Sequence, residues 1–474
     1  MKEKSLKTNF IYQNLYQLVR IMTPLITIPI ISDSFGPSGI GLISYSSTIM
    51  QYFLLFVTLG VQLYYNRIIA NSRNSEENLA RDFWSILYSK IIFGIFVLMV
   101  YIIVIIVFIK ENQIIYYIQG IYIIGAMIDI SWFYAGLEDF KLTSLSNVLA
   151  SIGVLIVVIV FINDSSDLLI YVFIINIVTV CNQIPLYIRL RRYNLKNTFD
   201  KALILLYFKN SFQYLLPTGS FLFCNMITIT LLRVFADYFE VGIISNGFNL
   251  VSIIVTLVTT IDLVLIPKLS RVTSNYNYDK LIKFLFKNIN IQLFLTIPLA
   301  FGLTAIMPIF HLWFFGEKFN ELVNISPYLS ILIIIIPLNT LISRQFILVT
   351  NQMRYYNLTI IYSCLINFIL GLIFIPHLGL IGALIIRIIA EIYIMISRFK
   401  KIRSFSQFEF DFSSIIKATI SSLIMYISVI YINFPIENLF IVTIFQLIVG
   451  VIIFVITSLL LKNKLFINLL SYLN

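Results

Sequence analysis

The sequence predicts an all-α polytopic membrane protein with about fourteen transmembrane helices. Of its 474 residues, 59% are hydrophobic and only 12% are charged, and the mean hydropathy is +0.95. Apolar stretches long enough to cross a bilayer recur along the whole chain. Lysine and arginine are distributed unevenly among the loops between these stretches. Together, these observations favour a chain that is embedded in lipid over a soluble globular domain.

The predicted spans have the length of about 20 residues that a helix needs to cross the hydrocarbon core. Pro376, Gly379 and Gly382 divide one long apolar stretch into two spans. The fourteen spans are 10–31, 40–62, 84–109, 115–137, 143–162, 168–188, 211–235, 241–266, 288–310, 326–347, 357–376, 379–397, 413–433 and 439–461.

The charges in the loops predict the orientation of the chain in the membrane. With a cytoplasmic N-terminus, 26 of the 33 lysines and arginines belong to cytoplasmic segments, two lie in outer loops and five lie within spans; Lys417, near the start of span 413–433, is counted with the cytoplasmic loop before it. Lysine and arginine are enriched in the cytoplasmic loops of membrane proteins. Both termini are therefore expected in the cytoplasm. The net charge of +11 is explained by orientation and anionic lipid, without a nucleic-acid partner.

A weak internal repeat predicts two parallel halves. At an offset of 201 residues, Gly41 and Ser44 align with Gly242 and Ser245, and a polar stripe recurs after both pairs. Internal repeats of this kind are common in transporters. We therefore expect two pseudo-symmetric six-helix lobes and two further helices. The predicted parts are an N-lobe (1–188), a basic cytoplasmic linker (189–210), a C-lobe (211–397), and a cytoplasmic loop with the last two helices (398–474).

The first span carries a positive charge deep in the membrane. Arg20 lies about ten residues into the span, near the midplane at ~1.5 Å of rise per residue. A charge at that depth costs at least ~2.5 kcal/mol, so it normally faces water or a partner. We expect Arg20 to line a wet cavity, and the alternative is a structural pair with Asp129. The polar residues at helical spacing on the same face are Gln13, Gln17, Thr23 and Thr27.

Other charges within the spans have local explanations that compete with a ligand role. Arg387 and Glu391 lie four residues apart, so an ion pair is as plausible as a ligand site. Arg344 and Lys90 lie near cytoplasmic helix ends, where long side chains extend to the surface. Arg233 lies near an outer helix end and either anchors the helix there or contributes to the cavity.

Two carboxylates are candidates for ion coupling. Asp129 lies halfway along the fourth span, and its own span has no cation at helical spacing. It is either a protonatable coupling site or the interhelical partner of an arginine. Glu391 is the second candidate. H⁺ and Na⁺ are the candidate coupling ions. Neither a cofactor nor a metal site is expected.

The deep arginines favour an anionic ligand, because a guanidinium binds phosphate oxygens bidentately and stays charged. The predicted substrate-binding residues are Arg20, Gln13, Gln17, Thr23, Thr27, Gln51, Arg233, Asn249, Arg344 and Arg387. No arrangement of catalytic residues is recognisable. The longest outer loop is 311–325, and a membrane-embedded glycan polymerase or ligase needs a larger external loop that carries carboxylates. A transporter is therefore expected rather than an enzyme.

Three stretches resemble one known family. They are residues 24–70 (beginning PLITIPIISDSFGPSGIG), FFGEKF at 314–319 and PHLGLIGALIIRIIAE at 376–391. They resemble the Wzx-type polysaccharide repeat-unit flippases, a branch of the multidrug/oligosaccharidyl-lipid/polysaccharide exporter superfamily. The resemblance implies two lobes that face each other across a central cavity lined by helices one, two, seven and eight.

The resemblance also implies a cargo and a location. The cargo is an undecaprenyl-diphosphate-linked oligosaccharide, moved by alternating access from the inner to the outer leaflet of the bacterial cytoplasmic membrane. It serves O-antigen, capsule or exopolysaccharide synthesis, and a polysaccharide polymerase and a chain-length regulator are the expected protein partners. A lipid II flippase stays an alternative. A cation-coupled multidrug antiporter is less favoured, because such relatives carry a carboxylate in the first helix and residues 10–31 contain none.

Overall fold

The computed structural model describes residues 6–58, 64–211, 215–274, 278–405, 410–432 and 437–466. Every regular element in these ranges is helical. Contacts divide the chain into two compact units, Met1–Met226 (unit 1) and Ile227–Asn474 (unit 2). The division falls inside helix α10 (Leu215–Phe235), and the predicted lobe boundaries stay a prediction.

Helix α1 (Leu6–Val57) contains the first predicted span, 10–31, and most of the second, 40–62. Gly36 interrupts it with φ 60° and ψ −178°, a backbone conformation that favours glycine. Pro37 follows and lacks a backbone N–H, so the helical hydrogen bonding is broken at the same place. The chain therefore bends between the predicted spans 10–31 and 40–62, at a kink between two helices rather than a loop.

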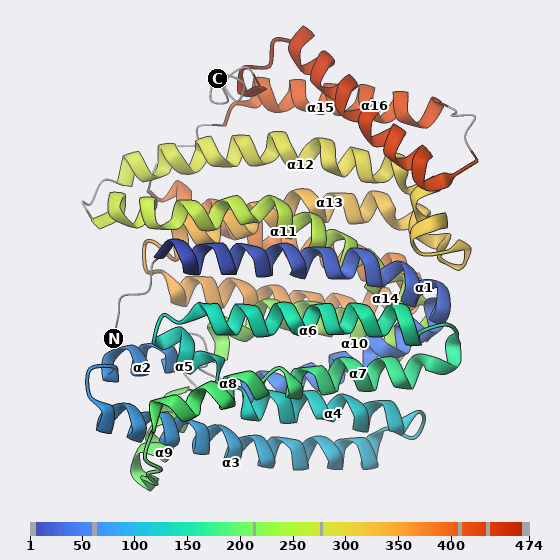
Figure 1. Cartoon of the computed structure of the whole chain (residues 1–474). Coiled ribbons are helices and arrows are strands. Elements are labelled where there is room, and N and C mark those ends of the chain that lie inside the picture. Colours follow the sequence, from blue (N-terminus) through green and yellow to red (C-terminus); the bar gives the residue numbers. More distant parts are fainter. Residues whose placement is uncertain are drawn as a thin grey trace. The chain divides into compact units, whose positions relative to one another are not determined.

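The rest of unit 1 packs around α1. Helix α1 contacts α3, α4 and α6, and α4 also lies beside α7 (Figure 1). The remaining helices of this unit are α2 (Asn66–Ser72), α3 (Glu76–Phe108), α4 (Gln113–Ile128), α5 (Ser131–Gly136), α6 (Phe140–Phe161), α7 (Leu168–Cys181), α8 (Ile184–Leu190) and α9 (Lys201–Ser211). A buried aromatic cluster that includes Phe83, Trp132 and Phe133 joins α3 to α5.

The fourth predicted span, 115–137, is not one continuous helix. Helix α4 ends at Ile128, Asp129 is extended with φ −62° and ψ 122°, and α5 begins at Ser131. The Asp129 carbonyl, which no longer serves an α-helical bond, accepts from the indole nitrogen of Trp132 at 2.8 Å. The break therefore has its own polar partners, and Gln113–Gly136 as a whole is still long and apolar enough to cross a membrane, as predicted for 115–137.

The predicted linker, 189–210, packs against the beginning of α3. The Trp84 indole nitrogen donates to the Leu195 carbonyl at 3.4 Å. The Tyr207 hydroxyl donates to Asp82 Oδ1 at 2.7 Å. Burial raises the pKa of Tyr207, so its hydroxyl stays protonated and remains a donor. These bonds attach the linker to unit 1.

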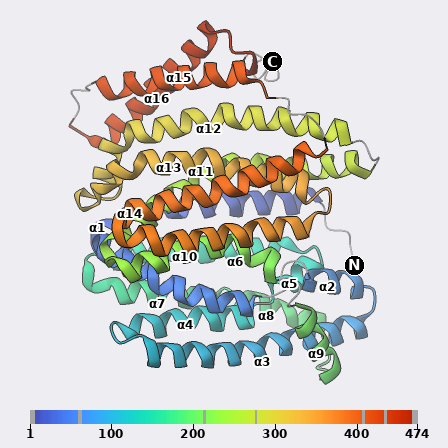
Figure 2. The same cartoon turned by 180° about the vertical axis from the view of Figure 1, so that it is seen from behind.

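Unit 2 is built around α12 and α13. Helix α12 contacts α13, α15 and α16, while α13 also contacts α11 and α14 (Figure 2). A short π-helix, Ser343–Ile347, follows α13 directly. The helices are α11 (Tyr238–Ser274), α12 (Tyr278–Phe314), α13 (Glu321–Ile342), α14 (Met353–Arg403), α15 (Phe412–Tyr431) and α16 (Leu439–Leu460).

Helix α14 contains the eleventh and twelfth predicted spans, joined at Gly379 with φ 51°. The division of this apolar stretch at the Pro-Gly segment is therefore confirmed. In the described ranges, eleven helices are long and apolar enough to cross a membrane; α14 holds two predicted spans, and α1 holds one predicted span and most of a second. The all-α polytopic class is confirmed, and the count of fourteen stays a prediction.

Candidate functional site

The first half of α1 exposes two different sides. At about 100° per residue, Arg20 lies roughly 155° around the helix from the centre of an exposed apolar side. Arg20 is itself exposed. An exposed apolar surface and a guanidinium thus lie on nearly opposite sides of the same helix. The residues of the apolar side are Leu15, Leu18, Met22 and Ile26, which are 45%, 62%, 52% and 39% exposed.

The other residues of the predicted stripe lie on the Arg20 side. Gln17 and Thr23 are half-buried and Thr27 is buried. The Thr23 hydroxyl donates to the Val19 carbonyl at 2.8 Å, which occupies it within its own helix. The Gln13 side chain lies outside the described residues. Arg20 is therefore the most accessible polar group among the described members of the stripe.

Arg20 is available for a ligand as far as the described residues go. In those ranges no hydrogen bond or ion pair involves its guanidinium. The predicted alternative, a structural pair with Asp129, is not formed. Instead, Lys90 Nζ lies 4.0 Å from Asp129 Oδ2 and donates to the Asp129 carbonyl at 2.7 Å.

The Lys90 and Asp129 pair corrects two predictions. The Lys90 side chain is 2% exposed, so it does not extend to the surface, and the partner of Asp129 is a lysine rather than an arginine. Asp129 Oδ1 also accepts from the Ser131 backbone N–H at 2.9 Å, which fixes the carboxylate at the start of α5. A coupling role for Asp129 stays a prediction.

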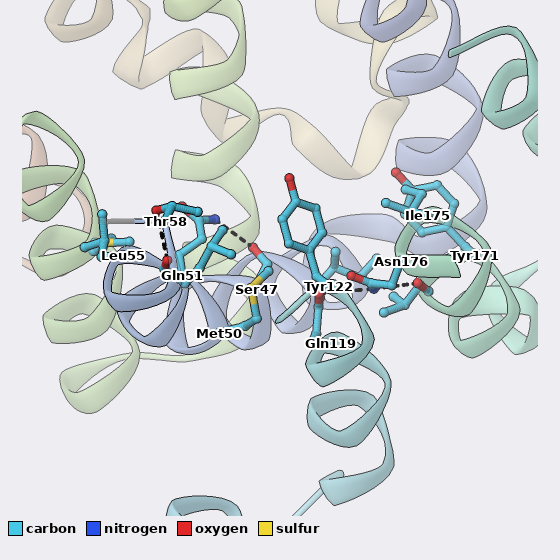
Figure 3. Close-up of a pocket in the computed structure, with 14 residues that line it drawn as sticks. Ser47, Met50, Gln51, Leu55, Thr58, Gln119, Tyr122, Tyr171, Ile175 and Asn176 are labelled. Carbon is cyan, nitrogen blue, oxygen red and sulfur yellow. Dashed lines mark hydrogen bonds between the residues drawn. The ribbon is translucent and has the colours of Figure 1, made fainter. Parts of the chain in front are cut away.

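Unit 1 contains a cavity of about 390 Å³ between the second half of α1, α4 and α7 (Figure 3). Gln51, a predicted site residue, lines it, so the predicted polar stripe of this helix does reach a cavity. The Gln51 side-chain amide donates to the Ser47 hydroxyl at 3.4 Å. The lining residues with polar side-chain groups are Ser47, Gln51, Thr58, Gln119, Tyr122, Tyr171 and Asn176.

A buried chain of hydrogen bonds supports one wall of this cavity. Gln119 Nε2 donates to Ser46 Oγ at 3.3 Å, and Asn176 Nδ2 donates to Gln119 Oε1 at 3.2 Å. These side chains are at most 4% exposed and join α1, α4 and α7. The sequence interpretation missed Gln119 and Asn176. A signal was available, since a single amide in an otherwise apolar span needs a partner on another helix.

In unit 2, the predicted pair on α14 is confirmed. Arg387 Nη2 lies 2.6 Å from Glu391 Oε1, and the two side chains are 2% and 1% exposed. Asn339 on α13 donates to Glu391 Oε2 at 2.6 Å, and Arg398 donates to the Asn339 carbonyl at 2.6 Å. The four side chains form a buried cluster that joins α13 to α14 and holds Glu391 between polar partners.

The other predicted residues of this part of the chain have local contacts. Arg344, in the π-helix, donates to the Thr259 carbonyl at 3.1 Å. The Arg233 guanidinium lies 4.0 Å from the centre of the Tyr238 ring, within the range of a cation–π contact. Asn249 is exposed on α11. The role of these residues and of Arg387 in substrate binding stays a prediction.

Comparison with known proteins adds a family and a fold. Residues 6–273 match the family described as "Polysaccharide biosynthesis protein". A protein of Escherichia coli (strain K12), described as a putative O-antigen transporter, is 27% identical over 173 residues. That match covers 36% of this chain and 41% of the relative, so the chain matches less than half of the length of this relative.

Solved structures with a similar fold are membrane transporters. One is lipid II flippase MurJ in an inward closed conformation, with a TM-score of 0.77 and 16% identity over 97% of this chain and 99% of that one. Another is an inward-facing multidrug resistance MATE family transporter of the MOP superfamily, with a TM-score of 0.62 and 14% identity. This second match covers 82% of this chain and 95% of that one. At these identities the likeness establishes the shared fold.

Proposed function

Because the chain belongs to the polysaccharide biosynthesis protein family, we propose that it is a flippase for undecaprenyl-diphosphate-linked oligosaccharide repeat units. It moves them from the inner to the outer leaflet of the bacterial cytoplasmic membrane. The observation that carries the proposal is the exposed guanidinium of Arg20, on the side of α1 opposite its exposed apolar side. Such a helix suits a path with lipid on one side and a phosphorylated cargo on the other.

The proposed mechanism is alternating access by two six-helix lobes in a chain of fourteen spans, with both termini in the cytoplasm. Arg20 holds the diphosphate, because a guanidinium binds phosphate oxygens bidentately and remains charged while water is excluded. The undecaprenyl tail stays in the bilayer, because moving it from lipid into a protein cavity would give no gain in free energy. The product supplies O-antigen, capsule or exopolysaccharide synthesis through a polymerase and a chain-length regulator.

Transport by this protein is proposed to be coupled to H⁺ or Na⁺. Asp129 and Glu391 are the candidate carboxylates for H⁺ or Na⁺. Each lies beside a cation, Lys90 or Arg387, so taking up a proton or Na⁺ requires the carboxylate to exchange that interaction for a new one. This exchange would couple ion binding to a rearrangement between helices in unit 1 or within α14.

The test is a clean deletion in the source bacterium. The expected result is loss of one surface glycan and accumulation of its lipid-linked repeat unit on the cytoplasmic face. Purified protein in vesicles should also speed the movement of that lipid-linked unit between leaflets. Normal surface glycan in a deletion strain without a second flippase would reject the proposal.

A lipid II flippase is the second candidate, and the same strain separates it from the first. Loss of a lipid II flippase would stop peptidoglycan synthesis rather than one surface glycan. A cation-coupled drug antiporter would instead change sensitivity to cationic dyes. The lack of a carboxylate in residues 10–31 weighs against that third candidate.

A further inference from the structure

The cavity of unit 1 has an unusual combination of polarity and neutrality. Of its fourteen described lining residues, none is Asp, Glu, Lys, Arg or His. A diphosphate placed there would find no cation to offset its desolvation, which is costly for an anion in a low-dielectric site. A cationic drug would find no carboxylate. An alkyl chain would displace water from the polar groups of the lining and could not replace the hydrogen bonds that the water made.

Two of its polar groups are free to bind a ligand. Within the described ranges, no protein group hydrogen-bonds to the Tyr122 hydroxyl or to the side-chain carbonyl of Gln51. In the view of Figure 3, the Tyr122 ring stands on α4 between Gln51 on α1 and Asn176 on α7. The Tyr122 ring offers an apolar face beside a polar tip, so one residue can contact both carbon-bound hydrogens and hydroxyls.

Other groups in the cavity are held in place before any ligand arrives. Gln119 and Asn176 are fixed by their bond to each other and by Ser46. A pre-formed, mostly apolar cavity with a few placed polar groups is typical of small-ligand sites, and about 390 Å³ lies within their usual range of about 300–1,000 Å³. Neutral rings with many hydroxyls are the ligand class that matches amides, hydroxyls and an aromatic face.

We propose that this cavity is the glycan subsite, where an uncharged sugar ring of the cargo binds Tyr122, Gln51 and the Gln119–Asn176 pair. This inference rests on the proposed function and adds to it a division of labour. The sugar is recognised by neutral groups of α1, α4 and α7, and the diphosphate is held by the guanidinium of Arg20. Selection among repeat units would then depend on this cavity rather than on the charged residues.

The test measures binding of a lipid-free sugar to the full-length protein in detergent. The probe is the reducing oligosaccharide released by mild acid from the lipid-linked intermediates of the source bacterium, and inorganic pyrophosphate is the anion probe. The double variant Gln51→Leu/Tyr122→Phe removes two free polar groups and keeps the volume similar. It should bind the oligosaccharide at least about 10-fold more weakly than the unmodified protein does. Its affinity for pyrophosphate should be unchanged.

The matched control is Tyr117→Phe, which makes the same chemical change on α4 at a 41% exposed residue outside the cavity. It should leave oligosaccharide binding unchanged. If the double variant does not fold, as judged by its thermal midpoint, each single variant should weaken oligosaccharide binding about 3-fold or more.

Three results would overturn the subsite. They are unchanged oligosaccharide binding by the variants, equal loss of pyrophosphate binding, and absence of oligosaccharide binding by the unmodified protein. A transport assay with the unmodified protein in vesicles distinguishes a failure of the subsite from a failure of the proposed function. If the protein moves that unit but its sugar does not bind in this cavity, only the subsite is wrong.

Discussion

At the scale of single residues, Arg20 is the side chain on which the proposed mechanism most depends. Arg20→Ala should slow transport about 10- to 150-fold, because a charge-assisted hydrogen bond contributes about 1.5–3 kcal/mol. Arg20→Lys should keep part of the activity, since the charge remains and the bidentate geometry is lost. Arg20→Glu should be slower than alanine through repulsion of the phosphates. Surface glycan and membrane abundance of the three variants are the measurements.

Abundance is the control in that series. Arg20 has no protein partner within the described residues, so Arg20→Ala should insert and accumulate normally. Adding Asp129→Asn should restore nothing, because Asp129 already lies beside Lys90. An Arg20→Ala protein of low abundance that Asp129→Asn rescues would show that the two residues pair after all.

What the sequence could predict at this scale depended on the distance between partners along the chain. Arg387 and Glu391 are one helical turn apart, so their pair follows from spacing alone. Lys90 and Asp129 are 39 residues apart, and Gln119 and Asn176 are 57 residues apart, on different helices. No periodicity within one span connects such residues. The polar face of α1 was predictable from the sequence. The polar contacts that α3, α4 and α7 make with one another and with the break after α4 were not.

At the scale of elements, the break between α4 and α5 depends on Lys90. Lys90→Met should lower the free energy of unfolding by about 1.5–3 kcal/mol, because the Asp129 carbonyl loses a charged donor and the carboxylate loses its cation. The matched control is Lys110→Met at an exposed residue just beyond the C-terminal end of the same helix, which should have little effect. The measurement is the thermal midpoint of each purified variant in one detergent. Equal midpoints for Lys90→Met and Lys110→Met would contradict a stabilising role.

The same pair gives a second element-scale prediction. Lys90→Met combined with Asp129→Asn should destabilise less than the sum of the two single variants, because each removes the same interaction. A double-mutant cycle on thermal unfolding measures the coupling. Strict additivity would mean that the contact between α3 and the break contributes nothing.

The kinks of α1 and α14 were predictable because glycine and proline mark them locally. Gly379 has φ 51°, and a Cβ atom there would lie 3.0 Å from a carboxylate oxygen of Glu240. Gly379→Ala should therefore destabilise by about 1–2 kcal/mol. Gly153→Ala is the control, since its added methyl group meets no heavy atom within 4 Å apart from the adjoining residues and backbone of its own helix, and α6 is helical there. This control should be neutral or stabilise by up to about 1 kcal/mol, and thermal midpoints compare the two.

At the scale of the whole molecule, composition and spacing predicted the all-α membrane class, but not which helices are continuous. Hydropathy counts apolar residues and is insensitive to a backbone break whose polar groups are satisfied by neighbours. Asp129 supplies such a break within an apolar stretch, and Trp132 and Lys90 satisfy its carbonyl. This explains why the fourth predicted span appeared continuous in the sequence.

Orientation is the property of the whole molecule that the loop charges predict most directly. Of 33 lysines and arginines, 26 lie in the segments assigned to the cytoplasm and two in the outer loops. In a background without native cysteines, single cysteines at Asn74 and Lys196 should resist an impermeant thiol reagent in intact cells. Cysteines at Glu111 and Asn163 should react. All four residues are exposed, so burial does not explain a difference between the two pairs.

Permeabilised cells provide the control, because all four cysteines should then react. The cysteine at Lys196 is the most informative, since it lies in the basic segment that packs against the beginning of α3. Its protection in intact cells would put Arg189, Arg191 and Arg192 on the cytoplasmic side too, beside anionic lipid headgroups. Labelling of Lys196→Cys from outside, with protection at Glu111→Cys, would show that the chain has the opposite orientation. The proposed side from which the cargo reaches Arg20 would then be wrong too.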